Sequence, residues 1–377
     1  MIRLSFSYAM TPIKNLKEVN TKNNSHHDYS HSITFIDIFS GMGGFRAGME
    51  QAGHICKGHC EIDKYANAVY NAIIHNRKDD EWYRSDITKI HTADIPKVDC
   101  WCFGFPCQGI SIAGKQQGLE DKRSGLFYAV TDLIRNTKEE NRPSYLFIEN
   151  VKNLLSINRG FDFLSVLTEL DEVGYDCEWT ICDSVKFGVP QHRERIFIIG
   201  HLRGRCTRQI FPLGNENKQP ENKIIKVGNI ADADSQANRI YSPDGISPTL
   251  NTCSGGRRVP MIVKNGTKKG YAEANVGDSI QLTFPHSTTR RGRVGKGVAH
   301  TLDTACNQGV YDGERIRRLT PLECFRLQGF TDEQFARAKT AVVNGKPVSD
   351  SQLYKMAGNA VTVKVIYEIA RKLEVLK

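Results

Sequence analysis

The chain has 377 residues, of which 40% are hydrophobic and 25% are charged, values that are ordinary for a globular protein large enough for more than one domain. No apolar run reaches the roughly 18 residues that a membrane span needs, and the polar first thirty residues lack the apolar core of a signal peptide. The 11 cysteines are scattered, with no Cys-x-x-Cys pair, which argues against a zinc site and a disulfide framework. We therefore expect a cytoplasmic protein with no membrane partner and no bound metal.

Short apolar runs alternate with helical patterns between residues 34 and 200. The helical spacing of Leu126, Val130, Leu133 and Ile134 predicts a helix over 124–138. Alternating strands and helices predict an α/β fold with a doubly wound, mostly parallel sheet. The runs that predict its buried strands are 34–39, 59–62, 98–103, 145–149 and 195–200.

The composition changes near residue 201, and the net charge of +9 lies beyond that point. Residues 201–318 carry 19 Lys and Arg against 10 Asp and Glu, whereas residues 1–200 carry 23 against 26. This segment predicts a smaller, loop-rich domain of short strands. Its charge suits a nucleic-acid surface or a solvated basic loop region, and charge alone does not choose between them.

Two stretches of this basic segment echo each other, one with Thr249-Leu250 and the other with Thr301-Leu302. The echo suits two loops that face one ligand, and it also suits a chance match. Helical patterning then returns at Thr320-Pro321-Leu322-Glu323, which predicts an N-cap, a proline at the first helical position and an acidic first turn. The last segment, 361–376, is amphipathic and is predicted to pack back onto the first domain.

A glycine-rich stretch, Phe39-Ser40-Gly41-Met42-Gly43-Gly44, follows a predicted strand and opens a helix. Glycines there allow a tight turn and a close approach to a ligand at the helix N-terminus. Glu61 ends the next predicted strand and is placed to accept hydrogen bonds from ribose hydroxyls, and Asp86 to accept one from an adenine amino group. Arg46 stands where the dinucleotide fingerprint has Gly or Ala, which disfavours a nicotinamide enzyme and leaves an ordinary turn as the alternative.

A cysteine and a glutamate follow neighbouring predicted strands. Cys107 comes after Pro106 and the run 98–103, and Glu149 ends the run 145–149. Open α/β sheets build their sites at the carboxyl ends of their strands. A thiolate beside a carboxylic acid is suited to attacking a ring carbon while protonating a ring nitrogen, which indicates chemistry on a pyrimidine. The alternatives are an inert buried cysteine and a helix-capping glutamate.

Two further motifs suggest binding roles. In Gln191-His192-Arg193-Glu194-Arg195, Arg193 and Arg195 alternate along a strand and so face one side, where guanidinium groups hold a carbonyl, a phosphate or Glu149. Glu194 is expected to face away into an ion pair. The turn Gly358-Asn359-Ala360-Val361 precedes the last helix and offers its amides to a cofactor. Surface salt bridges and a plain turn are the alternatives.

Together these motifs resemble the C5-cytosine DNA methyltransferases of bacteria and their phages. The match runs in family order from Phe35 to about Leu373 and includes Arg318-Leu319-Thr320-Pro321-Leu322-Glu323-Cys324 and Gln328-Gly329-Phe330. It implies an S-adenosylmethionine-dependent fold and methyl transfer to carbon 5 of a cytosine flipped out of double-stranded DNA. A tRNA cytosine-5 methyltransferase and a catalytically silent DNA-binding regulator are the alternatives.

The resemblance also implies residue roles. Cys107 would attack ring carbon 6, Glu149 would donate to ring nitrogen 3, and Arg193 and Arg195 would orient the glutamate and the base. The implied cofactor contacts are Phe39, Ser40, Gly41, Gly43, Gly44, Glu61, Ile62, Asp86, Ile87, Pro106, Asn359, Ala360 and Val361, although many relatives have a larger residue than Ile62 against the adenine. The implied DNA contacts are Gln108, Ser111, Lys115, Thr249, Leu250, Arg257, Arg258, Thr301 and Leu302, and which Thr-Leu pair is the recognition element stays open.

The resemblance finally suggests how the chain is divided. We expect a flexible tail at 1–32, a catalytic and cofactor-binding domain at 33–200, a target-recognition domain at 201–316 and C-terminal helices at 317–377. We expect a monomer, with a restriction endonuclease of the same system as a candidate partner that makes no direct contact. The sequence does not disclose the recognised DNA site.

Overall fold

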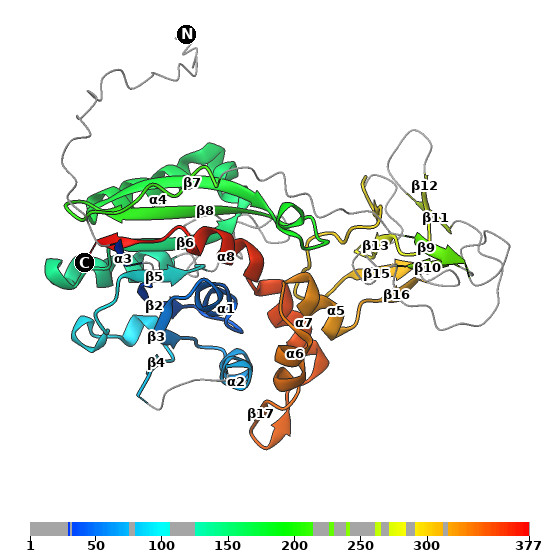
Figure 1. Cartoon of the computed structure of the whole chain (residues 1–377), viewed down its shortest axis with the longest axis horizontal. Coiled ribbons are helices and arrows are strands. Elements are labelled where there is room, and N and C mark those ends of the chain that lie inside the picture. Colours follow the sequence, from blue (N-terminus) through cyan, green and yellow to red (C-terminus); the bar gives the residue numbers. More distant parts are fainter. Residues whose placement is uncertain are drawn as a thin grey trace, which may run out of the picture.

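A large sheet flanked by helices lies beside a smaller region of short strands in the computed structural model of the chain (Figure 1). The structure describes residues 29–30, 32–74, 80–105, 125–213, 226–229, 239–241, 261–264, 271–283, 291–311 and 316–376. No described helix is long and apolar enough to cross a membrane.

The large sheet has seven strands in the order β4-β3-β2-β5-β6-β8-β7. Neighbours from β4 to β6 run parallel, whereas β8 is antiparallel to both β6 and β7. The doubly wound, mostly parallel sheet predicted from the sequence is therefore confirmed. Its strands are β2 (Thr34–Ile38), β3 (Ile55–Cys60), β4 (Trp82–Arg84), β5 (Cys100–Phe103), β6 (Tyr145–Val151), β7 (Tyr175–Asp183) and β8 (Glu194–Leu202).

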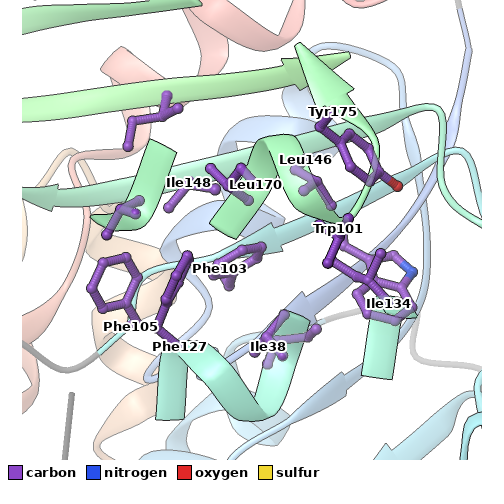
Figure 2. Close-up of a cluster of buried hydrophobic side chains, with 14 of the residues drawn as sticks. Ile38, Trp101, Phe103, Phe105, Phe127, Ile134, Leu146, Ile148, Leu170 and Tyr175 are labelled. Atoms are coloured by element: carbon purple, nitrogen blue, oxygen red, sulfur yellow. The ribbon is translucent and has the colours of Figure 1, made fainter. Parts of the chain in front are cut away.

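Alternate residues of the central strands point to opposite faces, and each face carries its own core. On one face, Ile38, Phe103 and Ile148 pack against α3 (Gly125–Asn136) and α4 (Phe161–Glu172), as Figure 2 shows for part of this cluster. On the other face, the strands pack against α1 (Gly44–Gln51) and α8 (Val363–Ala370). Both faces are covered, which is why the central strands are continuous apolar runs.

Helices α1 and α8 approach each other closely because glycine lies between them. A Cβ added to Gly48 would lie 2.6 Å from Ile366 Cβ and 2.8 Å from the carbonyl oxygen of Val363. One turn earlier, a Cβ on Gly44 would lie 2.7 Å from Val361 Cγ2. The absence of side chains therefore brings the glycine-rich loop against the turn that precedes α8.

We expect Gly48→Ala to lower the free energy of unfolding by about 1–3 kcal/mol, because an added methyl group in a tightly packed contact forces the helices apart. Urea denaturation measures the change. Gly125→Ala is the matched control, since its Cβ would meet no atom within 4 Å at the start of α3. Equal stability of the Gly48→Ala protein and the wild type would contradict this account of the α1–α8 contact.

The basic segment contains short antiparallel strands, as expected. The largest of its sheets has the order β14-β13-β15-β16. Its strands are β13 (Ser279–Gln281), β14 (Val294–Gly295), β15 (Gln308–Tyr311) and β16 (Ile316–Arg318), and the pairs β9 (Lys226–Asn229) with β10 (Arg239–Tyr241) and β11 (Met261–Lys264) with β12 (Tyr271–Ala274) form separate ladders.

A third core joins the C-terminal helices to α2 (Lys64–Ile73) and to the described loop 302–310. Thr320 and Glu323 form a complete capping box with proline at the start of α5, so the helix start predicted there is confirmed. The remaining elements are α5 (Pro321–Leu327), α6 (Asp332–Ala338), α7 (Asp350–Asn359), the hairpin of β17 (Val342–Val343) and β18 (Lys346–Pro347), and the pair of β1 (Tyr29–Ser30) with β19 (Val375–Leu376).

Candidate active site

A cavity of about 2060 Å³ lies at the carboxyl ends of the parallel strands. Its wall includes the residues that directly follow β2, β3, β4 and β5, together with the end of β6. Further parts of the wall come from the loop 300–305 and from residues between 355 and 361 around the end of α7. The cavity therefore lies where the sheet, the basic segment and the C-terminal helices meet.

The glycine-rich loop turns sharply at the end of β2. Phe39, Gly41 and Gly43 all have positive φ, at 55°, 55° and 88°. Ser40 and Gly41 line the cavity, and the Ser40 hydroxyl is buried with no hydrogen-bond partner in the described part of the chain. An unpaired buried hydroxyl is costly, so this atom suits a polar group of a ligand.

Glu61 supports this loop with its carboxylate. Its two oxygens accept the backbone N–H groups of Gly41 and Asp63, each at 2.7 Å. Burial raises the pKa of Glu61, and the two backbone hydrogen bonds oppose that rise. A carboxylate has about four acceptor positions, so acceptor capacity remains for the hydroxyl of a sugar. The next residue, Ile62, is 72% exposed and presents an apolar surface to the same cavity.

Asp86 and Ile87 line the cavity on the far side of Glu61. The Asp86 carboxylate accepts the backbone N–H and the hydroxyl of Thr88, and hydrogen bonding from that hydroxyl is the main cause that lowers the pKa of Asp86. Asp86 therefore stays a charged acceptor at neutral pH. Apolar Ile62, the Glu61 acceptors and the Asp86 acceptor together fit the adenine and ribose of a nucleoside.

Glu149 lies on β6, and its carboxylate contacts Arg195 at the start of β8. The Arg195 Nε and Glu149 Oε1 atoms are 3.0 Å apart, and the side chains are only 15% and 12% exposed. Burial raises the pKa of Glu149, while the charges of Arg195 and Arg193 oppose the rise. Strand β6 continues to Val151, so Glu149 lies within the strand and not at its end as predicted. Pairing with β8 holds Glu149 in place, and its raised pKa favours a protonated carboxyl.

Of the partners considered for Arg193, the structure shows carbonyls, which belong to the backbone, and no ion pair with Glu149 among the described residues. Its guanidinium donates to the backbone carbonyls of Leu302, Gly358 and Ala360, at 3.4, 3.1 and 2.8 Å. The prediction assumed strand alternation, but β8 begins only at Glu194, so Arg193 precedes the strand. Its charge acts on Glu149 through space. The ion pair predicted for Glu194 is present, with Lys152 at 2.8 Å.

Segment 191–193 also holds the Thr301-Leu302 pair at the cavity. The Thr301 hydroxyl donates to the carbonyl of His192 at 2.8 Å, and the Leu302 N–H donates to Gln191 Oε1 at 2.9 Å. Thr301 and Leu302 both line the cavity. The other Thr-Leu pair, Thr249-Leu250, lies outside the described residues.

The structure brings most of the predicted site residues together. All the described cofactor candidates line the cavity except Gly43, where a Cβ would instead lie 3.0 Å from the ring of Tyr70. Among the described residues, no group of three His, Cys, Asp or Glu side chains is placed to hold a metal ion. The predictions that fall outside the described residues concern Pro106, Cys107, Gln108, Ser111, Lys115, Thr249, Leu250, Arg257 and Arg258.

Several residues of the cavity wall were not predicted. Gln281 ends β13 and Thr283 lies two residues further on, and each has a buried side-chain oxygen, Oε1 and Oγ1 respectively, without a hydrogen-bond partner in the described chain. Lys355 also lines the cavity and pairs with Asp63 at 2.7 Å. These residues stand in no recognisable motif, so only the folded arrangement reveals them. The other unpredicted polar residues of the wall include Lys152, Asn153, Arg291, His300 and Asn307.

Comparison with known proteins identifies close sequence relatives. The profile of the family described as C-5 cytosine-specific DNA methylase matches residues 33–375. The type II methyltransferase M1.ScrFI of Lactococcus lactis subsp. cremoris is 35% identical, over 91% of this chain and 78% of that protein. The type II methyltransferase M.HpaII of Haemophilus parainfluenzae is 33% identical, over 90% of this chain and 89% of that protein.

Solved structures share the fold at lower sequence identity. The Dnmt2 methyltransferase of S. pombe has a TM-score of 0.56 at 18% identity and covers 90% of this chain and 97% of its own. A putative DNA modification methyltransferase encoded within an E. coli prophage also has a TM-score of 0.56, at 20% identity, over 90% of this chain and 98% of its own. At these identities the likeness shows the fold alone.

Proposed function

The chain belongs to the C-5 cytosine-specific DNA methylase family and is a DNA (cytosine-5)-methyltransferase, and from this premise we propose how its residues perform the reaction. Relatives that are named type II methyltransferases, 33–35% identical over about 90% of this chain, favour the DNA enzyme over the tRNA enzyme and the silent regulator. Membership of the family implies S-adenosylmethionine as the methyl donor. The observation that carries the residue assignment is the nearly buried Glu149–Arg195 pair at the wall of a cavity whose other end fits a nucleoside.

The cofactor-binding end is the one formed by the loop 39–44, Glu61, Asp86 and the turn 358–361. Glu61 has acceptor positions left for ribose hydroxyls, Ile62 offers an apolar surface to adenine, and Ser40 has an unpaired hydroxyl. When bound, S-adenosylmethionine supplies an electrophilic methyl group on a sulfonium. The residues present fit this group, and Gly43 is reassigned to the packing of the loop on Tyr70.

The chemical step uses Cys107 and Glu149. The Cys107 thiolate bonds to carbon 6 of the flipped cytosine, and Glu149 protonates ring nitrogen 3 as the electrons of the 5,6 double bond shift. Carbon 5 thereby becomes nucleophilic and accepts the methyl group, which leaves S-adenosylhomocysteine, while ring nitrogen 3 returns its proton to the Glu149 carboxylate. Loss of the carbon-5 proton restores the double bond and expels the Cys107 thiolate. Arg195 holds the Glu149 carboxyl in place throughout.

The recognition element is the Thr301-Leu302 pair. It lies at the cavity wall and is hydrogen-bonded to the segment that leads into Arg195. The basic segment around it supplies the positive charge that duplex DNA requires.

We keep the proposed division into tail, catalytic domain, recognition domain and C-terminal helices. The boundary between the catalytic and recognition domains moves from 200 to 213, because Ile210 and Phe211 still pack in the core of the large sheet.

Gln281 is proposed to contact a base edge. Its side-chain amide oxygen, Oε1, is buried without a partner among the described residues, and glutamine amides bind adenine in the major groove through paired hydrogen bonds. We expect Gln281→Ala to relax the methylated sequence at one position, with methylation elsewhere retained. Bisulfite sequencing measures this, and Gln209→Ala, which loses a bond to the Phe211 carbonyl, is the matched control. An unchanged set of methylated sites would contradict the assignment.

The relatives named as type II methyltransferases suggest that the chain protects DNA within a restriction-modification system or a mobile element. Bisulfite sequencing of plasmid DNA from cells that express the chain, with Cys107→Ser as control, tests the function. We expect protected cytosines within one short recurrent sequence, and none with the variant. Protection that persists with Cys107→Ser would contradict the assigned nucleophile, and no protection from a folded protein would contradict the function.

A further inference from the structure

Segment 191–193 is joined to segment 299–302 by several hydrogen bonds. The His192 N–H donates to the carbonyl of Ala299 at 2.9 Å, and the Ala299 N–H donates to the carbonyl of Pro190 at 2.9 Å. The side-chain bonds of Gln191 and Thr301 described above add two more. These bonds fix the Thr301-Leu302 pair relative to β8, the strand that carries Arg195.

Arg193 extends this connection to the cofactor side of the cavity. Its NH1 group donates to the Leu302 carbonyl, and its NH2 group donates to the carbonyls of Gly358 and Ala360. These two carbonyls flank Asn359 in the turn assigned to the cofactor. One guanidinium therefore bridges the recognition segment and the cofactor turn, which are more than fifty residues apart in the sequence.

The cost of placing Arg193 there indicates a specific purpose. The residue is 2% exposed, and no carboxylate of the described chain lies within salt-bridge distance of it. Desolvation lowers the pKa of Arg193, as expected for a buried cation whose hydrogen bonds go to carbonyls. A buried charge costs several kcal/mol and is kept only where its hydrogen bonds fix a geometry. The geometry fixed here is that of the two ligand-facing segments.

We propose that Arg193 is a positioning residue that joins the cofactor turn 358–360 to the recognition segment 299–302, so that ordering of one segment orders the other. The proposal rests on the assigned cofactor and recognition ends of the cavity. In this proposal Arg195 contacts the target base and Arg193 does not. By thermodynamic reciprocity, each ligand then favours the conformation that the other requires.

Hydrogen exchange followed by mass spectrometry tests this on the full chain, with S-adenosylhomocysteine as a probe that transfers no methyl group. In the wild type, we expect the probe to slow exchange in peptides covering 356–362 and also in peptides covering 299–302. In Arg193→Met, we expect the probe still to slow exchange at 356–362 but no longer at 299–302. With the probe bound, peptides covering 299–302 should then exchange roughly tenfold faster than in the wild type, because hydrogen bonds to a charged group have been removed. If the methionine variant unfolds, Arg193→Lys serves in its place. Lysine keeps the charge but lacks the several N–H donors of the guanidinium, so we expect the same result.

Arg142→Met is the matched control. Arg142 also donates to three backbone carbonyls, those of Arg135, Thr137 and Val173, but it joins α3 to the turn after α4, away from the cavity. In Arg142→Met, the probe should still slow exchange both at 356–362 and at 299–302. A probe response at 299–302 that survives in both Arg193 variants, or that is absent from the wild type, would overturn the proposal. Absence of the wild-type response at 356–362 would instead overturn the cofactor assignment, and the coupling with it.

Discussion

Replacing Cys107 by serine is expected to lower methyl transfer to DNA by at least about 10⁴-fold, because a serine hydroxyl is a far weaker nucleophile than a thiolate and nothing else in the reaction replaces the bond to carbon 6. Cys107 itself lies outside the described residues. The chain reaches the cavity wall two residues earlier in the sequence, where Gly104 and Phe105 line it. A Cβ on Gly104 would lie 3.2 Å from Glu149 Oε2, which places this part of the chain beside the proposed proton donor.

Incorporation of labelled methyl groups into DNA measures this effect, and a gel-shift assay shows whether binding survives. We expect the Cys107→Ser protein to bind DNA as the wild type does. The control is Cys206→Ser, since Cys206 is an exposed free cysteine away from the cavity and should tolerate the change. Methyl transfer by Cys107→Ser at the wild-type rate would exclude Cys107 as the nucleophile.

Replacing Glu149 by glutamine is expected to lower the rate of methyl transfer by about 10²–10⁴-fold, the usual contribution of general acid catalysis. The amide keeps the size of the carboxyl and an acceptor for Arg195, so the fold and the cavity should be retained. It cannot transfer a proton to ring nitrogen 3. The control is Glu169→Gln, because Glu169 is also 12% exposed and paired with an arginine, at 2.7 Å, but lies on α4 away from the cavity.

The pH dependence of the same reaction gives an independent check on Glu149. Burial raises its pKa above the ordinary value, and the proposed mechanism uses the protonated form. The rate should therefore be highest below the raised pKa and fall as the pH increases through it. The Glu149→Gln variant has no such group, so its rate should not show this fall with increasing pH. The same fall in rate in the wild type and the variant would show that another group titrates in this pH range.

The sequence predicted the central sheet well because its strands are buried on both faces. Residues 100–103 and 145–148 are continuously apolar, and they lie in β5 and β6. The edge strand β7 was missed, since its alternation of Glu178, Trp179 and Thr180 reflects a half-exposed surface. The first half of β3 was missed because Lys57 and Gly58 interrupt the apolar pattern.

The site was predictable where a motif marks it and not where only packing decides. Glu149 and Arg195 stand in motifs, and the structure brings them together. The position of Arg193 was not predictable, because its partners are backbone carbonyls of segments far away in the sequence. Gln281 has no motif at all and reaches the cavity through the fold of β13 and β15. The proposal that Thr301-Leu302 is the recognition element rests on the contacts of Thr301 and Leu302, which no sequence pattern announces.

The central claim is a covalent bond between Cys107 and the target cytosine, and mass spectrometry of the protein after reaction with a trapped substrate tests it most directly. A duplex with the recognised sequence and 5-fluorocytosine at the target position cannot lose a proton from carbon 5, so the adduct accumulates in the presence of S-adenosylmethionine. The account predicts one DNA strand bound per protein, on the peptide that contains Cys107. An adduct on another residue, or efficient methylation of ordinary DNA with no adduct on the fluorinated duplex, would contradict it.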